Sequence, residues 1–324
     1  MNILVVGGAG YIGSHMCKCL SEAGHRVIVL DNLATGHREA VQWGDLVVGS
    51  LDDRALVADI LKSRGIDAVM HFAASSLVGE SMLDPFRYYQ NNVSATLSLL
   101  QVMREQRVDR FIFSSTAAVF GEPESATIAE DHPRRPINPY GKSKLAVEYM
   151  LEDAAAAYGL RAVALRYFNA AGADATASIG ESHEPESHLI PKLLRKAVGE
   201  ALDVQIFGTD YPTADGTCIR DYIHVADLAD AHLLALEYTA KQPGFHTFNL
   251  GNGNGYSVLE VLSAVEQVIG RPLEVPRGPR RAGDPAILVA SSAKARDLLG
   301  WRPQRAAITQ IVGDAWRWHQ NRRF

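Results

Sequence analysis

The chain has 324 residues, 47% of them hydrophobic, and a formal net charge of −5. This length and apolar content suffice for two modest domains that share an interface. Acidic and basic residues are mixed along the sequence, which argues against nucleic acid or an anionic membrane as the partner. The three cysteines have neither zinc-type nor redox-type spacing, so we expect reduced thiols and no metal. No apolar run approaches the roughly 20 residues that cross a bilayer, and the first residues do not form a signal peptide; we therefore expect a cytoplasmic protein.

The first thirty residues predict a nucleotide-binding unit. A continuous apolar run at 2–6 reads as a buried strand, and Gly7, Gly10 and Gly13 follow it directly. A helical pattern at 14–23 and a second buried strand at 26–30 lead to Asp31. Glycines let the backbone approach a pyrophosphate at the helix N-terminus, and an acid about 20 residues later accepts hydrogen bonds from ribose. Because a 2′-phosphate would meet the charge of Asp31, this pattern favours NAD over NADP.

The next hundred residues continue the alternation of strand and helix. We expect strands at 46–48, 68–72 and 110–113, a helix beginning near Asp52, and a long helix over about 85–105. This rhythm is typical of a doubly wound parallel sheet. Ser114, Ser115 and Thr116 stand at the carboxyl end of the last of these strands, where open α/β sheets bind ligands.

A helix beginning at Pro139 carries the strongest candidate for chemistry. Proline suits the first helical position, and Gly159 marks the expected stop. Tyr140 and Lys144 are four residues apart and so share one helix face. An ammonium near a phenol favours the phenolate, and bringing the pKa of tyrosine from about 10 to about 7 takes about 4 kcal/mol. We expect the lysine, together with a bound cationic nicotinamide, to make Tyr140 a base for a hydroxyl group.

The alternation breaks after a strand at 161–165, and a polar loop at 172–186 marks the start of a second domain. A helix at 188–201, an amphipathic helix at 224–238 and a buried strand at 247–250 follow. Ser257 and Glu260 have the spacing of a capping box. Guanidinium groups bind phosphate oxygens in pairs, but Arg220 and Arg281 taken singly read as members of surface ion pairs, and only the family resemblance given below makes them candidate ligands for a pyrophosphate.

Taken in order, these motifs resemble the extended short-chain dehydrogenase/reductase family and, within it, the UDP-glucose 4-epimerases. The resemblance covers nearly the whole chain. It implies a Rossmann-type doubly wound sheet with a smaller α/β C-terminal substrate domain. The NAD-binding domain would consist of residues 1–170 plus roughly 224–255. The UDP-sugar-binding domain would consist of residues 171–223 plus roughly 256–324. The residues that carry it are Gly7, Gly10 and Gly13, Asp31-Asn32-Leu33, His71-Phe72-Ala73-Ala74, Tyr89, Asn91-Asn92-Val93, Ser114-Ser115-Thr116, Tyr140-Gly141-Lys142-Ser143-Lys144, Arg166-Tyr167-Phe168-Asn169, 207–213, 215–217, 220–225 and Pro279-Arg280-Arg281-Ala282-Gly283-Asp284.

The resemblance also implies roles for individual residues. Thr116, Tyr140 and Lys144 would be catalytic, inverting C4 of UDP-glucose or UDP-galactose through a transient 4-keto sugar. The implied cofactor contacts are Gly7, Gly10, Tyr11, Ile12, Gly13, Asp31, Asn32, Leu51, Phe72, Ala73, Ala74, Asn91, Ser114, Tyr140, Lys144 and Tyr167. The implied substrate contacts are Ser115, Thr116, Asn169, His188, Leu189, Phe207, Arg220, Tyr222, Arg281 and Asp284. A homodimer packed through helices at about 85–106 and 140–158 is implied as well.

Other activities remain as alternatives. A nucleotide-sugar 4,6-dehydratase needs acidic residues after the catalytic threonine, whereas Ala117 and Ala118 follow Thr116 here. A non-catalytic NAD-binding regulator would not need the intact Thr116, Tyr140 and Lys144. Leu288 falls at the position that gates room for an N-acetyl group and is bulky, so we expect UDP-hexoses to be preferred over UDP-N-acetylhexosamines; a UDP-pentose stays open.

Overall fold

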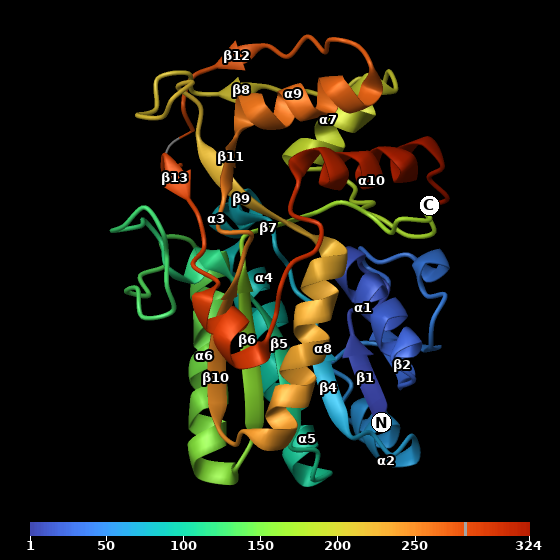
Figure 1. The fold of residues 1–324 in the computed structure, drawn as a ribbon. Helices are drawn as coiled ribbons and strands as arrows, with labels where there is room; N and C mark the ends of the chain where they lie inside the picture. Colours follow the sequence, from blue (N-terminus) through green and yellow to red (C-terminus); the bar gives the residue numbers. More distant parts are fainter. Residues whose placement is uncertain (282–283) are drawn as a thin grey trace.

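The computed structural model describes residues 1–281 and 284–324. Its larger lobe is built on a seven-stranded parallel sheet, and a smaller lobe sits beyond the carboxyl ends of those strands (Figure 1). The strands lie in the order β10-β6-β5-β4-β1-β2-β3. Their bounds are β1 Asn2–Val6, β2 Arg26–Asp31, β3 Asp45–Val48, β4 Ala68–His71, β5 Arg110–Thr116, β6 Arg161–Tyr167 and β10 Phe245–Leu250.

The sheet forms from strands that are apolar on both faces. Ile3, Leu4 and Val5 of β1 are fully buried, as a strand covered by helices on both sides requires. β1 pairs with β2 on one side and with β4 on the other. The chain therefore changes direction across the sheet at β1, and open α/β sheets bind ligands outside such a switch point. The predicted doubly wound parallel sheet is confirmed.

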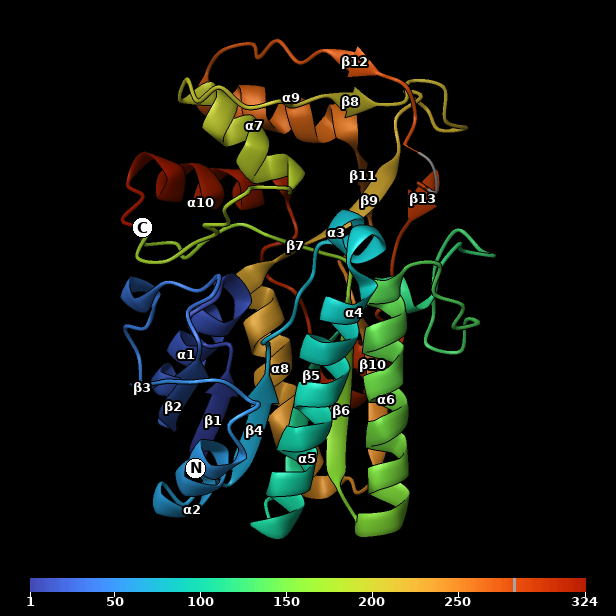
Figure 2. The same cartoon turned by 180° about the vertical axis from the view of Figure 1, so that it is seen from behind.

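Helices cover the two faces of the sheet. α1 and α8 lie on one face, and α2, α5 and α6 on the other, as opposite views show (Figures 1 and 2). The expected long helix at 85–105 is interrupted by a π-helical segment, Tyr89–Ser94, and a short helix that we did not expect precedes it. The bounds are α1 Tyr11–Glu22, α2 Arg54–Ser63, α3 Val78–Leu83, α4 Pro85–Tyr88, α5 Ala95–Glu105, α6 Pro139–Tyr158 and α8 Val225–Lys241.

α6 begins and ends where its sequence indicates. Asn138 caps it by accepting a hydrogen bond from the Gly141 N–H at 2.8 Å, and Pro139 takes the first helical position. Gly159 ends the helix with a φ of +72°, a left-handed conformation that glycine adopts without strain. The same helix therefore fixes the register of both Tyr140 and Lys144.

The smaller lobe packs three helices beside short strands. α7 ends at Ala197, earlier than the expected 201, because Gly199 turns the backbone to a φ of +94°. The capping box predicted at Ser257 and Glu260 is present at the start of α9. The bounds are β7 Asn169–Ala171, α7 Leu189–Ala197, β8 Ile206–Phe207, β9 Ile219–His224, β11 Gly255–Ser257, α9 Val258–Ile269, β12 Arg277–Gly278, β13 Ile287–Leu288 and α10 Ile308–Gln320, with short 3-10 or π turns at 38–40, 117–119 and 295–299.

The chain passes repeatedly between the lobes. After β9 it runs back along the sheet as α8, and β10 then pairs with β6 along its full length. No helix within 1–281 or 284–324 combines the length and apolar character of a membrane span. Of the motif at 279–284, Ala282 and Gly283 lie outside the described residues.

Candidate functional site

The glycine-rich turn after β1 leaves bare backbone at the start of α1. A side chain at Gly7, whose φ is +79°, would place its Cβ 2.5 Å from the backbone nitrogen of Ala73, and one at Gly13 would come within 2.1 Å of the Gly7 carbonyl oxygen. Gly10 precedes the helix without a side-chain cap. Free N–H groups at a helix N-terminus suit phosphate, so this turn fits the pyrophosphate of a dinucleotide.

Asp31 closes β2 beside that turn. Its Oδ2 accepts the Ala9 N–H at 2.9 Å and its Oδ1 accepts the Leu33 N–H at 2.8 Å. The carboxylate thus holds the glycine-rich turn against the end of β2, and it stands where Rossmann units place their ribose acceptor. The neighbouring Asn32 is exposed and accepts the N–H of Ala34.

Tyr140, Lys144 and Thr116 meet at the carboxyl end of β5. Lys144 donates from Nζ to the Ser114 carbonyl oxygen at 2.8 Å, and its ammonium lies 4.8 Å from the centre of the Phe113 ring. The Thr116 side chain lies close enough to Tyr140 to favour the ionised form of the phenol. The structure therefore brings together the phenol, the ammonium and the hydroxyl that the sequence singled out.

The electrostatics of this group differ from our expectation. Burial lowers the pKa of Lys144 to about 7, with Glu148 opposing the change. Burial also raises the pKa of Tyr140, and the nearby Thr116 side chain only partly offsets this change. The protein's own groups thus do not lower the tyrosine pKa, because Lys144 is itself desolvated and directs its ammonium at a backbone carbonyl.

The other expected cofactor residues lie after several different strands of the sheet. Phe72, Ala73 and Ala74 follow β4 beside the glycine-rich turn, and the Ser114 hydroxyl is hydrogen-bonded to the Tyr167 hydroxyl. The Tyr11 hydroxyl donates to the Gly172 carbonyl oxygen at 2.7 Å. Two further residues pack in the core clusters of the sheet, Ile12 at the edge of one and Leu51 inside the other.

Asn91 is exposed, whereas its neighbour Asn92 is buried. Asn92 donates from Nδ2 to Ser143 Oγ at 3.0 Å and accepts the Ser75 N–H at 2.9 Å. It therefore links the loop after β4 to the helix turn that carries Tyr140 and Lys144. Asn91 and Asn92 belong to the same sequence motif. Their side chains point in different directions because the two residues occupy successive positions of a helical segment.

Ser115, which was expected to contact substrate, is buried. Its hydroxyl donates to Glu148 Oε1 at 2.6 Å inside the larger lobe. Arg166 binds the same buried carboxylate in two places, at 2.9 and 2.6 Å. Successive strand residues face opposite sides of a sheet, so Ser115 points away from the face that Ser114 and Thr116 share. Glu148, Arg166 and Ser115 form a buried polar cluster that sequence reasoning missed.

Four expected substrate contacts converge in the smaller lobe although they are far apart in sequence. The Arg281 guanidinium lies 4.9 Å from the centre of the Phe207 ring and donates from Nε to Asp284 Oδ2 at 2.8 Å. Arg220 donates to two backbone carbonyl oxygens, those of Ile219 and Pro285, and lies 3.7 Å from Asp284. The guanidinium groups of Arg220 and Arg281 therefore both lie near the Asp284 carboxylate.

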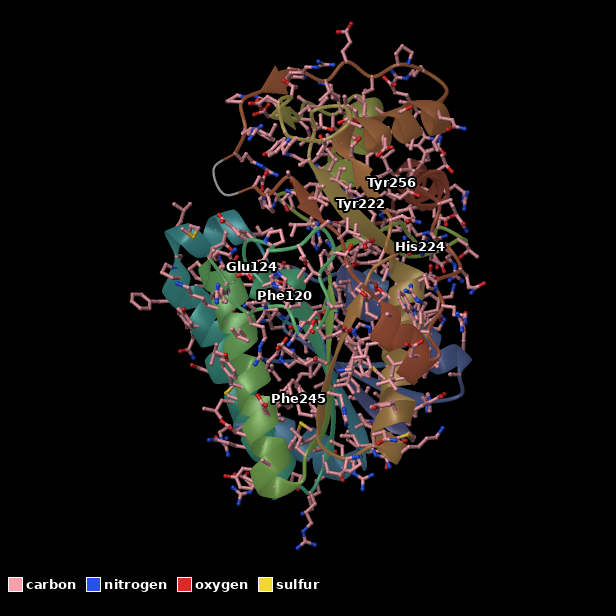
Figure 3. The ribbon with its side chains drawn as sticks, turned by 60° about the vertical axis from the view of Figure 1, so that its left-hand side comes forward. Phe120, Glu124, Tyr222, His224, Phe245 and Tyr256 are labelled. Atoms are coloured by element: carbon pink, nitrogen blue, oxygen red, sulfur yellow. The ribbon has the colours of Figure 1, made fainter. Side chains whose placement is uncertain are left out.

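The remaining expected substrate contacts line the junction of the lobes. Asn169 on β7 is opposite Tyr222 on β9 in the strand register and donates from Nδ2 to the Asp221 carbonyl oxygen at 2.9 Å. Figure 3 shows Tyr222 in the smaller lobe, above Phe120 at the end of the larger one. His188 precedes α7, which begins at Leu189; the His188 side chain is half-exposed and its Nδ1 contacts Glu181.

Comparison with known proteins covers nearly the whole chain. Residues 3–251 match the model of the NAD dependent epimerase/dehydratase family. A UDP-glucose 4-epimerase of Lacticaseibacillus casei is 50% identical over 99% of this chain and 97% of its own length. One from Halalkalibacterium halodurans is 53% identical, covering 99% and 96%. The crystal structure of UDP-glucose 4-epimerase from Brucella ovis in complex with NAD is 49% identical over 98% of this chain and 97% of that one, with a TM-score of 0.94.

Proposed function

The chain belongs to the NAD dependent epimerase/dehydratase family, and from that premise we propose that it is an NAD-dependent enzyme that inverts C4 of UDP-glucose and UDP-galactose. The observation that carries this proposal is the meeting of Tyr140, Lys144 and Thr116 at the end of β5, in a sheet whose β1 and β2 carry the glycine-rich turn and Asp31. Full-length similarity to UDP-glucose 4-epimerases supports the choice of sugar nucleotide.

Tyr140 acts as the base and acid for the sugar 4-hydroxyl in this proposal. It takes the hydroxyl proton as C4 is oxidised and returns it after the sugar has turned over. Thr116 donates a hydrogen bond to the same oxygen. The chemistry that bound NAD supplies is reversible hydride transfer at C4, by way of a 4-keto sugar.

Lys144 keeps a positive charge beside the reacting oxygen. Because burial holds its pKa near 7, a small change in its surroundings suffices to change its protonation. The positive charge of a bound nicotinamide close to Tyr140 would favour the phenolate. The protein's own groups do not by themselves lower the pKa of Tyr140.

Cofactor and nucleotide are held by different parts of the chain. We assign NAD to residues 1–170 with roughly 224–255, where the glycine-rich turn and Asp31 hold its pyrophosphate and ribose. We assign the UDP-sugar to residues 171–223 with roughly 256–324, where Arg220 and Arg281 bind the pyrophosphate and Phe207 and Asn169 the uridine. A firm hold on UDP with a loose hold on the sugar lets the keto intermediate present its other face. We place the enzyme in the cytoplasm, as a homodimer.

A single incubation tests the activity. Purified protein given UDP-galactose without added NAD should form UDP-glucose, because the hydride taken from C4 returns to the same carbon. Loss of water to a 4-keto-6-deoxy sugar would instead identify a dehydratase. NAD binding without conversion of the sugar nucleotide would favour the alternative of a non-catalytic NAD-binding regulator.

Substitution of Tyr140 by phenylalanine tests its role. The hydroxyl is the only group removed, and we expect turnover to fall by about 10²- to 10⁴-fold, the usual contribution of a general base. Melting temperature and bound NAD should stay close to those of the parent. Turnover near that of the parent would rule out Tyr140 as the base.

A further inference from the structure

The loop before α7 gathers four side chains of metal-binding types, of which only His188 was named above, as an expected substrate contact. Glu181, His183, Glu186 and His188 fall within eight residues, and one ligand atom from each lies within 4.8 Å of all the others. We expected no metal because the three cysteines lack zinc-type spacing. Glutamate and histidine side chains alternate in the sequence of this loop, and the fold brings their ligand atoms together.

The ligand atoms lie at separations close to those of a tetrahedral coordination sphere, some slightly shorter and some slightly longer. Glu181 Oε1 lies 3.0 Å from His183 Nδ1, and Glu186 Oε1 lies 3.7 Å from His188 Nδ1; Glu181 Oε1 also contacts His188 Nδ1. Metal–ligand bonds of about 2.0–2.2 Å in a tetrahedron place neighbouring ligand atoms about 3.4 Å apart. Small movements of four side chains are therefore enough to enclose an ion.

The two carboxylates are held in place by the surrounding structure. The Glu181 and Glu186 side chains are almost fully buried. Trp318 of α10 donates from Nε1 to the Glu181 carbonyl oxygen at 2.9 Å. Glu186 Oε1 accepts the N–H groups of Ser187 and His188 at 2.7 and 2.9 Å. The imidazoles lie toward solvent, with the His183 side chain 32% and that of His188 51% exposed, which leaves a path by which an ion can enter.

The ligand types select the cation. Two imidazole nitrogens with two carboxylate oxygens suit a divalent transition metal such as Zn²⁺, whereas Mg²⁺ and Ca²⁺ prefer oxygen ligands alone. With both imidazoles neutral, the two carboxylates balance the charge of one divalent ion. We propose that Glu181, His183, Glu186 and His188 form a binding site for one zinc-type cation, which fastens the loop to the start of α7.

Calorimetric titration of the tag-free, NAD-loaded protein with zinc chloride tests the site. We expect one Zn²⁺ per chain, and no comparable binding of Mg²⁺. The double substitution His183→Gln/His188→Gln should weaken zinc binding by at least about tenfold, and because both side chains reach solvent, it should leave folding intact. The matched control is His246→Gln, a partly exposed histidine on β10, which should bind zinc as the parent does.

Circular dichroism and NAD content establish that each variant is folded. Glu181→Gln supplies a second variant, since an amide keeps the shape of the side chain but loses the charge. Absence of one-to-one binding in the parent, or equal affinity in the parent and the double variant, would overturn the proposal. Because these readouts measure binding alone, they are independent of the epimerase activity proposed above.

Discussion

At the scale of single residues, Lys144 shows a conflict between stability and chemistry. It is only 2% exposed, and burial lowers its pKa from 10.5 to about 7. Burying an ammonium costs free energy, so the folded chain spends stability to keep a lysine at this position. The cost follows from holding the amino group in the buried site beside Tyr140, where we propose that its charge acts.

Lys144→Met should change how stability depends on pH. Between pH 7 and 10.5 the unfolded lysine binds more protons than the folded one, so the parent gains stability relative to the variant as pH rises, by up to about 1.4 kcal/mol per pH unit. At pH 7 and below the full cost applies and the variant is at its greatest advantage. Chemical denaturation of both proteins between pH 7 and 9.5 measures this slope. Lys142→Met, exposed on the same helix, should show the parent's slope; parallel curves for parent and Lys144→Met would contradict the pKa shift.

Leu288 provides a residue-scale prediction about specificity. It lies on β13 opposite Arg220 of β9 and packs against the cluster of Val119 and Phe120. Leu288→Ala should open space there and raise activity on UDP-N-acetylgalactosamine relative to UDP-galactose by about tenfold, the usual size of such pocket effects. The ratio of the two kcat/KM values measures it. Ile287→Ala is the control, because the Ile287 side chain points to the opposite side of the strand. An unchanged ratio in Leu288→Ala would show that Leu288 does not control access of the N-acetyl group.

At the scale of elements, local signals were predictable and long-range directions were not. The glycine-rich turn, the ends of α6 and the capping box of α9 depend on neighbours in sequence, and all three were predicted correctly. The early end of α7 and the π-helical segment at 89–94 were missed. The side that a strand or helix residue faces depends on packing, so the sequence did not show that Ser115 bonds to Glu148 or that Asn91 is exposed while Asn92 is buried. Phe207, Arg220 and Arg281 were linked only by family resemblance.

Two glycines in helices should respond in opposite ways to alanine. Gly13→Ala places a methyl group against the Gly7 carbonyl oxygen, so we expect a lower melting temperature and loss of bound NAD. Gly313 lies within α10 with open space around its Cβ position, so Gly313→Ala should stabilise the protein by about 0.5–1 kcal/mol through helix propensity. Thermal unfolding and NAD absorbance after purification measure both effects. A Gly13→Ala protein that retains NAD would show that the turn tolerates a side chain.

At the scale of the whole molecule, α3 to α6 present an exposed apolar face. The most exposed members are Leu83 at 88% and Phe86 at 82%. Exposed apolar side chains gathered on neighbouring helices suggest a protein–protein interface, and these helices include both that were expected to form the dimer. The other large exposed apolar residues of this face are Val78, Met82, Tyr89, Leu97, Tyr149 and Tyr158.

Phe86→Glu should separate the proposed dimer. A carboxylate at the centre of an apolar interface is desolvated without a partner, and we expect a monomer in size-exclusion chromatography with light scattering. Leu298→Glu replaces another exposed leucine, outside this face, and should leave the oligomeric state unchanged. A Phe86→Glu protein that remains dimeric would place the interface elsewhere.

The repeated passage of the chain between the lobes has a consequence for dissection of the molecule. The larger sheet takes β1 to β6 from residues 2–167 and β10 from residues 245–250, while the smaller lobe takes β7 to β9 before β10 and β11 to β13 after it. No continuous fragment therefore corresponds to either lobe. A protease that cuts once within 172–186 leaves two pieces that still share the seven-stranded sheet through the β6–β10 pairing, so the nicked protein stays together until it is denatured.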